Sequence, residues 1–164
     1  EMCIRDRHRS CFIYEKEKSG KKTGSNLNKT SEISAVLIAP CGMNCGICIG
    51  YLRDKKKCPG CNKESDSKPG TCKKCIIKNC EHIKESSSGF CYECPKYPCR
   101  RLKQLDKRYR TKYHMSMLEN LTLIKEEGIE VFLKKEDAKW ACPECHSRLS
   151  AHRNDCLVCG AKIF

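Results

Sequence analysis

Apolar residues recur at helical spacing between residues 100 and 140, and this is the clearest periodic pattern in the chain. They are separated by charged and amide residues: Leu102, Leu105, Tyr109, Leu118, Leu121, Ile124, Ile129, Phe132, Leu133 and Trp140. Intervals of three and four residues predict amphipathic helices. Ser116 and Glu119 fit a capping box at the start of a second helix, and Gly128 fits the stop before a third. We therefore expect three helices that hold most of the apolar core.

The one continuous apolar run is Ile33–Ala39 (ISAVLIA), and its seven residues are too few to span a bilayer. Pro40 directly before Cys41 does not suit the small-residue cleavage site of an exported lipoprotein. We expect Val36–Ala39 to form a strand or a buried extended segment that leads into the next region, and we expect no membrane association.

Residues 1–31 show no hydrophobic periodicity. Glu1–Arg7 (EMCIRDR) resembles an in-frame translation of a transposon end used in sequencing libraries, so we treat it, with its Cys3, as a sequencing artefact. Residues 8–31 are rich in Lys, Ser, Gly and Asn, which is typical of a disordered extension. Cys11 stands alone there and is given no role.

The stretch from Cys41 to Cys99 has few large apolar residues but eleven cysteines in 59 residues. They are Cys41, Cys45, Cys48, Cys58, Cys61, Cys72, Cys75, Cys80, Cys91, Cys94 and Cys99. Most come in pairs separated by two residues (CGIC, CPGC, CKKC, CYEC), a spacing that lets two thiolates of one turn face the same metal ion. This region is therefore expected to be folded by metal.

The whole chain of 164 residues contains 17 cysteines and carries a formal net charge of +13. The odd count and the paired spacing argue against a disulfide scaffold and favour a reducing, cytoplasmic location. The positive charge is a nucleic-acid signal, but a zinc ion with four thiolates is a net dianion. Three such sites would lower the net charge to about +7, so part of the basic excess balances metal sites.

The strongest metal signal is the last block, CPEC and CLVC separated by ten residues. Its ligands are Cys142, Cys145, Cys156 and Cys159. Two such turns present four thiolates in a tetrahedron, as a structural zinc site requires. Gly160 suits a positive φ after the last cysteine. His152 lies between the pairs and is interpreted as a loop residue.

A second candidate repeats this ten-residue gap: Cys58, Cys61, Cys72 and Cys75. The intervening residues 62–71 are expected to form a surface turn. The first pair also resembles a thioredoxin-type redox motif, although the βαβ context of that motif is missing.

Cys41, Cys45 and Cys48 form C-x3-C-x2-C, which matches the triad of radical S-adenosylmethionine enzymes. The large barrel of those enzymes is absent, so a four-ligand site completed by Cys80 or Cys99 is the alternative. Seven thiols remain once the second ribbon is set aside, and with His82 they could form two four-ligand sites. Zinc and iron–sulfur clusters both accept four thiolates, so both remain open for this module.

Seven basic residues crowd positions 100–112: Arg100, Arg101, Lys103, Lys107, Arg108, Arg110 and Lys112. They could track a nucleic-acid backbone, but a solvated face beside polyanionic metal sites is the preferred interpretation. The sequence shows no Ser-His-Asp set, phosphate loop or carboxylate pair. We therefore lean towards a protein that is not an enzyme.

The motifs IAPCGMNCGICIGYL, CPGC, CKKCIIKNC and FCYECPKYPC, taken in this order, resemble the cysteine-rich prokaryotic family known as domain of unknown function 3795. The continuation NLTLIKEEGIEVFLKKEDAKWACPEC is similar to longer members that end in a zinc ribbon. The resemblance covers about residues 38–160. It implies an architecture and a bound metal but no reaction.

Together these patterns predict a small metal-stabilised α+β protein. It would comprise an extension (1–31), an irregular cysteine-rich metal-binding module (32–99), a short helical segment (100–140) and a C-terminal zinc ribbon (141–164). We expect a cytoplasmic protein whose metals, mainly zinc, are structural and which acts by binding a protein partner. The alternatives are an iron–sulfur electron-transfer protein of anaerobic metabolism and a nucleic-acid binder that uses residues 100–112.

Overall fold

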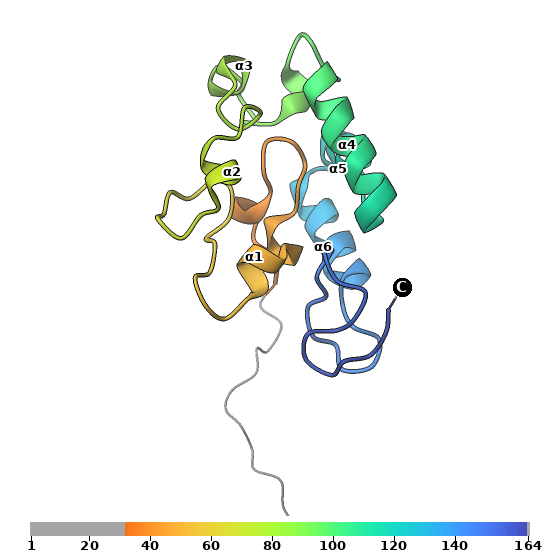
Figure 1. Ribbon diagram of the computed structural model, residues 1–164. Helices are drawn as coiled ribbons and strands as arrows, with labels where there is room; N and C mark the ends of the chain where they lie inside the picture. Colours follow the sequence, from red (N-terminus) through yellow and green to blue (C-terminus); the bar gives the residue numbers. More distant parts are fainter. Residues whose placement is uncertain (1–31, 164) are drawn as a thin grey trace, which may run out of the picture.

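A computed structural model describes residues 32–163, so the predicted extension at residues 1–31 lies outside the described residues. Three long helices follow one another in the second half of the chain: α4 (Arg100–Tyr113), α5 (Met117–Glu127) and α6 (Ile129–Lys139) (Figure 1). The prediction of three helices between residues 100 and 140 is confirmed.

The cysteine-rich segment contains only single turns of helix, joined by loops. They are η1 (Ala35–Leu37), η2 (Cys45–Ile47), α1 (Ile49–Leu52), α2 (Gly70–Lys73), α3 (Glu81–Lys84) and η3 (Cys91–Glu93). Such short elements bury too little apolar surface to be stable alone. The segment therefore depends on its packing against the long helices and on its cysteines.

The ends of the long helices follow from local sequence. His114 adopts a left-handed conformation with φ of 51° and ends α4. The Ser116 hydroxyl accepts a hydrogen bond from the amide of Glu119, as the capping box predicts, and so begins α5. Gly128, with φ of 86°, separates α5 from α6. A residue with a Cβ is strained at such a φ, which explains the glycine at this junction.

The β structure of the described residues is limited to three isolated bridges: Ile38 with Asn44, Ala141 with Arg148, and Asp155 with Lys162. The expected small fold, with a cysteine-rich module, a helical segment and a C-terminal four-cysteine block, is confirmed, and helix dominates it. None of the described helices is long and apolar enough to cross a membrane.

The segment Val36–Ala39 is not a regular strand. Ala35–Leu37 forms the 3-10 turn η1, and only Ile38 pairs, with Asn44. The amide of Ala39 donates to the carbonyl of Met43 at 2.8 Å, so the chain reverses before a strand can extend. Ile38 and Ala39 are nonetheless buried, as an extended segment leading into the cysteines requires.

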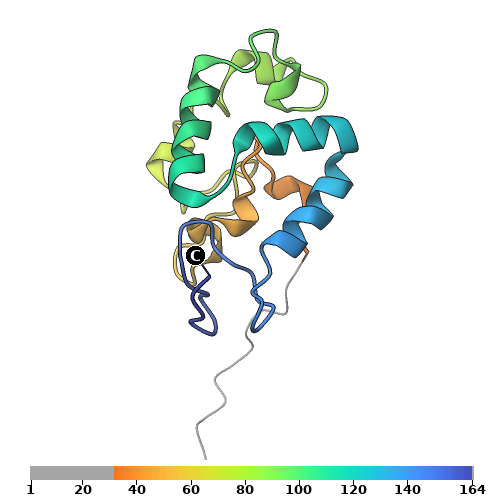
Figure 2. The same ribbon diagram turned by 90° about the vertical axis from the view of Figure 1, so that its right-hand side faces the viewer.

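One cluster of buried apolar side chains includes residues from every part of the described chain. Its largest fully buried members are Trp140, Phe132, Ile38, Ile47, Leu102, Met117 and Leu121. The core is therefore shared with the cysteine-rich segment, whereas the sequence placed most of it in the helices. Figure 2 shows α4, α5 and α6 wrapping around residues 33–52, with the C-terminal block below them.

Candidate metal centre

The sulfurs of Cys142, Cys145, Cys156 and Cys159 all lie within 4.8 Å of one another. The Sγ atoms of Cys142 and Cys159 are 3.7 Å apart, and so are those of Cys145 and Cys156. A zinc ion with Zn–S bonds of about 2.3 Å holds its four sulfurs about 3.8 Å apart. The arrangement of the four side chains is therefore compatible with a tetrahedral metal ion.

The first half of this centre is a tight turn that begins at Cys142. The amide of His146 donates to the carbonyl of Cys142 at 2.9 Å, and the amide of Cys142 donates back to the carbonyl of Ser147 at 2.9 Å. His146 adopts a positive φ of 58°. This backbone geometry directs Cys142 and Cys145 to the same side of the turn.

The second half repeats the same turn. The amide of Gly160 donates to the carbonyl of Cys156 at 3.0 Å, and the amide of Cys156 donates to the carbonyl of Ala161 at 2.8 Å. Gly160 has a φ of 74°, which confirms the expectation from the sequence. In the first half, His146 occupies the position equivalent to Gly160 and also has a positive φ. A histidine does not indicate such a conformation in the way that a glycine does.

Ser147 belongs to this candidate centre, although the sequence gave no sign of it. Its hydroxyl lies 3.0 Å from Sγ of Cys145 and 3.1 Å from Sγ of Cys156. Burial opposes ionisation of Cys156, but this hydroxyl and the backbone amides of Cys159 and Val158 hold the pKa of Cys156 down to about 6. The surroundings therefore favour thiolate, the form that binds metal.

His152 packs against α4. Its ring centroid lies 4.6 Å from that of Tyr113 and 6.0 Å from that of Tyr109. Beside it, the amide of Ala151 donates to the carbonyl of Ile47 at 2.9 Å. His152 thus helps to hold the C-terminal block onto α4, and Ala151 holds it onto the cysteine-rich segment.

The cysteine-rich module gathers its thiols differently from the C-terminal block. Cys41 and Cys45 are buried, and Cys45 shares a hydrogen bond with Cys61. Burial raises the pKa of Cys41, and the nearby thiols of Cys61, Cys91 and Cys75 raise it further. We call Cys41, Cys45, Cys61 and Cys75 the inner thiols, since they surround the buried start of the module.

A second neighbourhood contains Cys48, Cys58 and Cys72. The amide of Cys58 donates to the carbonyl of Gly50 at 2.8 Å, and a Cβ built on Gly50 would lie 3.6 Å from Sγ of Cys48 and 3.6 Å from Cβ of Cys58. Burial raises the pKa of Cys72, and the thiols of Cys61, Cys58 and Cys48 add to the shift. These contacts place Cys48 beside Cys58.

The two neighbourhoods adjoin, because Cys61 interacts with Cys41 and Cys45 and also with Cys72. Among the residues that the structure describes, the C-terminal quartet is the one group of three or more ligand atoms that converges to within 4.8 Å. The structure does not bring together the second ribbon (Cys58–Cys75) or the triad of Cys41, Cys45 and Cys48 in that way. Their assignment as metal ligands stays a prediction.

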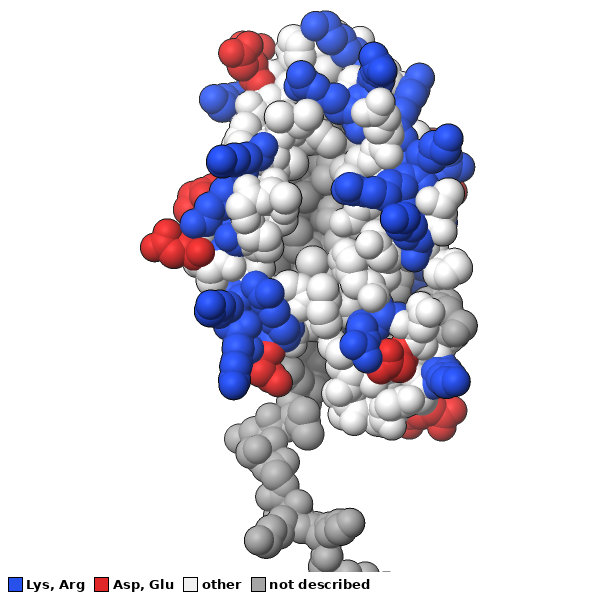
Figure 3. Space-filling model, in the orientation of Figure 1, with Lys and Arg blue, Asp and Glu red and all other residues white. Residues whose placement is uncertain are grey.

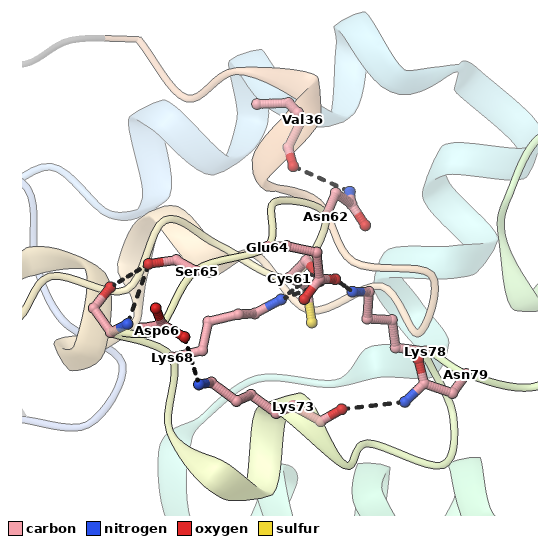
Figure 4. A network of polar contacts seen from close by, with 11 residues as sticks. Val36, Cys61, Asn62, Glu64, Ser65, Asp66, Lys68, Lys73, Lys78 and Asn79 are labelled. Atoms are coloured by element: carbon pink, nitrogen blue, oxygen red, sulfur yellow. Dashed lines mark hydrogen bonds and ion pairs between the residues drawn. The ribbon is translucent and has the colours of Figure 1, made fainter.

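A polar network surrounds Cys61 (Figure 4). Lys68 is only 4% exposed, and its Nζ donates to the carbonyl of Cys61 at 2.8 Å. Lys68 also pairs with Glu64 at 3.9 Å, and Lys78 pairs with the same carboxylate. The hydrogen bond with Cys45, assisted by both lysines, lowers the pKa of Cys61 to about 6. The expected surface turn at residues 62–71 thus contributes a buried cation.

The remaining four cysteines of the module line one cavity beside the start of α4: Cys80, Cys91, Cys94 and Cys99. His82 lines the same cavity, so it lies near thiols, as the sequence allowed. We call these four residues the cavity cysteines. All fifteen cysteines in the described part of the chain are free of disulfides, which leaves every one of them available to metal.

The basic residues of α4 are exposed. Figure 3 shows Lys and Arg side chains gathered along the α4 side of this face, with few acidic side chains among them. Arg110 pairs with the buried carboxylate of Asp106 at 2.8 Å, and the Arg108 guanidinium lies 5.7 Å from the centre of the Tyr109 ring. Both contacts lie within α4 itself, so neither ties the basic face to another element.

Residues 37–104 match the family described as "Protein of unknown function (DUF3795)". The resemblance expected from the cysteine motifs is confirmed over this range, which covers the cysteine-rich module and the start of α4. The C-terminal quartet lies beyond the match, and its own geometry is compatible with a zinc ribbon-like module. No curated protein matches the chain, and no solved structure does.

Proposed function

We propose that this chain is a cytoplasmic metal-binding protein in which the C-terminal quartet holds one structural zinc ion. The observation that carries the proposal is the convergence of four cysteine sulfurs to within 4.8 Å, with two S–S separations of 3.7 Å. Free thiols throughout the described residues suit a reducing compartment. The zinc would fix the two turns of the block, which lack any regular strand.

The quartet closes its own coordination shell, and this supports a structural role. Structural zinc sites use four protein ligands, whereas catalytic sites keep one position open for water or substrate. The Ser147 hydroxyl lies 3.1 Å from Sγ of Cys156, and the amide of Val158 donates to the same sulfur at 3.4 Å. Such outer hydrogen bonds orient the ligands and tune the metal.

The proposal includes a protein partner. Leu157 and Val158 lie between the last two cysteines and remain 41% and 45% exposed. A zinc-fixed turn would present both apolar side chains rigidly, which lowers the entropy lost on binding. The double change Leu157→Ser and Val158→Ser is expected to retain the zinc and to reduce crosslinking of the chain to its partner in cells.

Metal counting on the full chain tests the zinc assignment. Cys145→Ser should release about one zinc per chain, because serine is a poor ligand for this ion. His152→Ala is the matched control, since His152 lies between the same cysteine pairs but packs on α4. It should keep its zinc. Equal zinc in the wild-type protein and the Cys145 variant contradicts the proposal.

A further inference from the structure

The cavity cysteines surround a hollow of about 590 Å³ next to α3 and the beginning of α4. They come from three separate elements. Cys80 directly precedes α3, and Cys99 directly precedes α4. Cys91 begins η3, and Cys94 directly follows it. Residues 80 to 99 thus bring four thiols to one cavity, although they do not form two matching C-x2-C turns as the C-terminal quartet does.

Backbone hydrogen bonds hold these cysteines in place. The amide of Cys91 donates to the carbonyl of Pro40 at 2.8 Å, which fixes η3 to the core. The amide of Tyr97 donates to the carbonyl of Cys94 at 2.8 Å, and the amide of Lys103 donates to the carbonyl of Cys99 at 3.0 Å. Cys99 therefore lies at the N-terminus of the fourteen-residue helix α4.

The four thiols line this one cavity at different depths. Cys91 is only 7% exposed, whereas Cys80, Cys94 and Cys99 are half-buried. Thiolates bind metal in deprotonated form, so four of them around one cavity would bring negative charge that a bound metal offsets.

The spacing of the cavity cysteines differs from that of the C-terminal quartet. No three of their sulfurs converge to within 4.8 Å, although every one of these residues is described. A single zinc ion would need separations of about 3.8 Å. Four cysteines around a cavity rather than around a point suit a cluster of several atoms, because each thiolate then binds a different iron.

The rest of the lining suits an anionic cluster. Its apolar members are Ile76, Ile77, Ile83 and Leu102, which would limit access of water. Its basic members are Lys74, Lys96, Arg100 and Arg101, against one acidic member, Glu81, so the charge of the lining is positive and would offset an anionic group. The basic excess at the start of α4 thus has a local partner that does not require nucleic acid.

We propose that the cavity cysteines hold one iron–sulfur cluster of the four-cysteine, four-iron type. His82 lines the cavity but is not a ligand, since four thiolates complete such a cluster. This inference rests on the proposed metal-binding function and assigns a cofactor class to one part of the module. It makes the module chemically different from the zinc-binding block.

The test uses the full chain, purified anaerobically and then reconstituted with ferrous iron and sulfide. Iron, sulfide and zinc are measured together, and the visible absorption spectrum is recorded. Cys91→Ser and Cys94→Ser should each lose about four irons and four sulfides per chain relative to the wild-type protein. The zinc content should not change, because the C-terminal quartet is a separate site.

Two variants serve as controls. Cys145→Ser should lose zinc and keep iron, and His82→Ala should keep both. Cys94 is less buried than Cys91, so its variant retains more of the packing, and far-ultraviolet circular dichroism checks that α4 to α6 persist. Reconstituted protein without iron, or equal iron in the wild-type protein and both serine variants, overturns the inference. Zinc lost in place of iron from those variants also overturns it. The zinc proposal is tested separately, and it fails if Cys145→Ser has the same zinc content as the wild-type protein.

Discussion

Asn44 links the cysteine-rich module to α6, and its replacement gives the sharpest test of how the two are joined. Its side chain is fully buried, and Nδ2 donates to Oε2 of Glu136 at 2.9 Å. Its Oδ1 accepts from the amide of Gly46 at 2.9 Å. Asn44→Ala removes both bonds. It leaves a buried amide and a buried carboxyl group without these partners.

The expected cost is large for one substitution. An unsatisfied buried neutral group costs about 1–3 kcal/mol, and a charged one costs more. Asn44→Ala should therefore lower the free energy of unfolding by about 3–5 kcal/mol. Asn79→Ala is the matched control, because Asn79 is exposed and its Nδ2 donates to a carbonyl at 3.2 Å. Asn79→Ala should change the free energy of unfolding by no more than about 0.5 kcal/mol.

Glu136 gives this link a dependence on pH. Burial raises its pKa, while the Asn44 bond and the charges of Lys139 and Arg148 oppose the shift. A carboxyl group with a raised pKa holds its proton more tightly in the folded state. Its contribution to stability is therefore greatest below the unfolded pKa and is lost as pH rises through the folded pKa. Glu136→Gln should remove this part of the pH dependence of stability. The variant should be no less stable than the wild-type protein at neutral pH.

The assay is denaturant unfolding of the metal-loaded chain at several pH values, with both single variants and the double variant. In the Glu136→Gln background, Asn44→Ala should cost only about 1–3 kcal/mol, since no charged group is left unpaired. Equal costs in the two backgrounds, or a cost below about 1 kcal/mol for Asn44→Ala, would refute this reasoning.

Three further predictions concern the loop at Gly42, the N-cap of α5 and the basic face of α4. Gly42→Ala should destabilise the fold by about 1–3 kcal/mol in thermal unfolding, because φ is +83° and a Cβ would lie 2.8 Å from a backbone oxygen of α5. Ser116→Ala should cost about 1–2 kcal/mol through loss of the N-cap of α5, and an unchanged melting temperature would contradict that role. Arg101, Lys107 and Arg108, changed together to Gln, should lower stability by less than about 1 kcal/mol. No salt-sensitive nucleic-acid binding is expected before or after that change. Micromolar binding at physiological salt that the triple change abolishes would establish the alternative.

The helices and the C-terminal quartet could be predicted because their signals are local. Apolar periodicity and the Ser116 cap specify α4 to α6 without reference to the rest of the chain. Each half of the quartet is a six-residue turn whose cysteines face one way whatever surrounds them. Local sequence is sufficient where the structure is made by local hydrogen bonds.

The arrangement of the module could not be predicted, because C-x2-C spacing allows two outcomes. Both thiols of a pair can converge with further ligands on one point, as Cys142 and Cys145 do, or they can remain outside such a group, as Cys58 and Cys61 do. Long-range contacts decide between them, such as the approach of Cys58 to Gly50. Local sequence also fails to predict the burial of Lys68, because the loop that contains it has the polar composition of an exposed turn.

Zinc K-edge X-ray absorption of the full chain tests most directly whether the C-terminal quartet holds a zinc ion. The account predicts at least about one zinc per chain with four sulfur neighbours at about 2.3 Å, the distance that S–S separations of 3.7 Å accommodate. Cys145→Ser should remove this signal or replace one sulfur by oxygen. A wild-type chain that retains no zinc, or whose zinc is bound mainly by oxygen or nitrogen, would contradict the account.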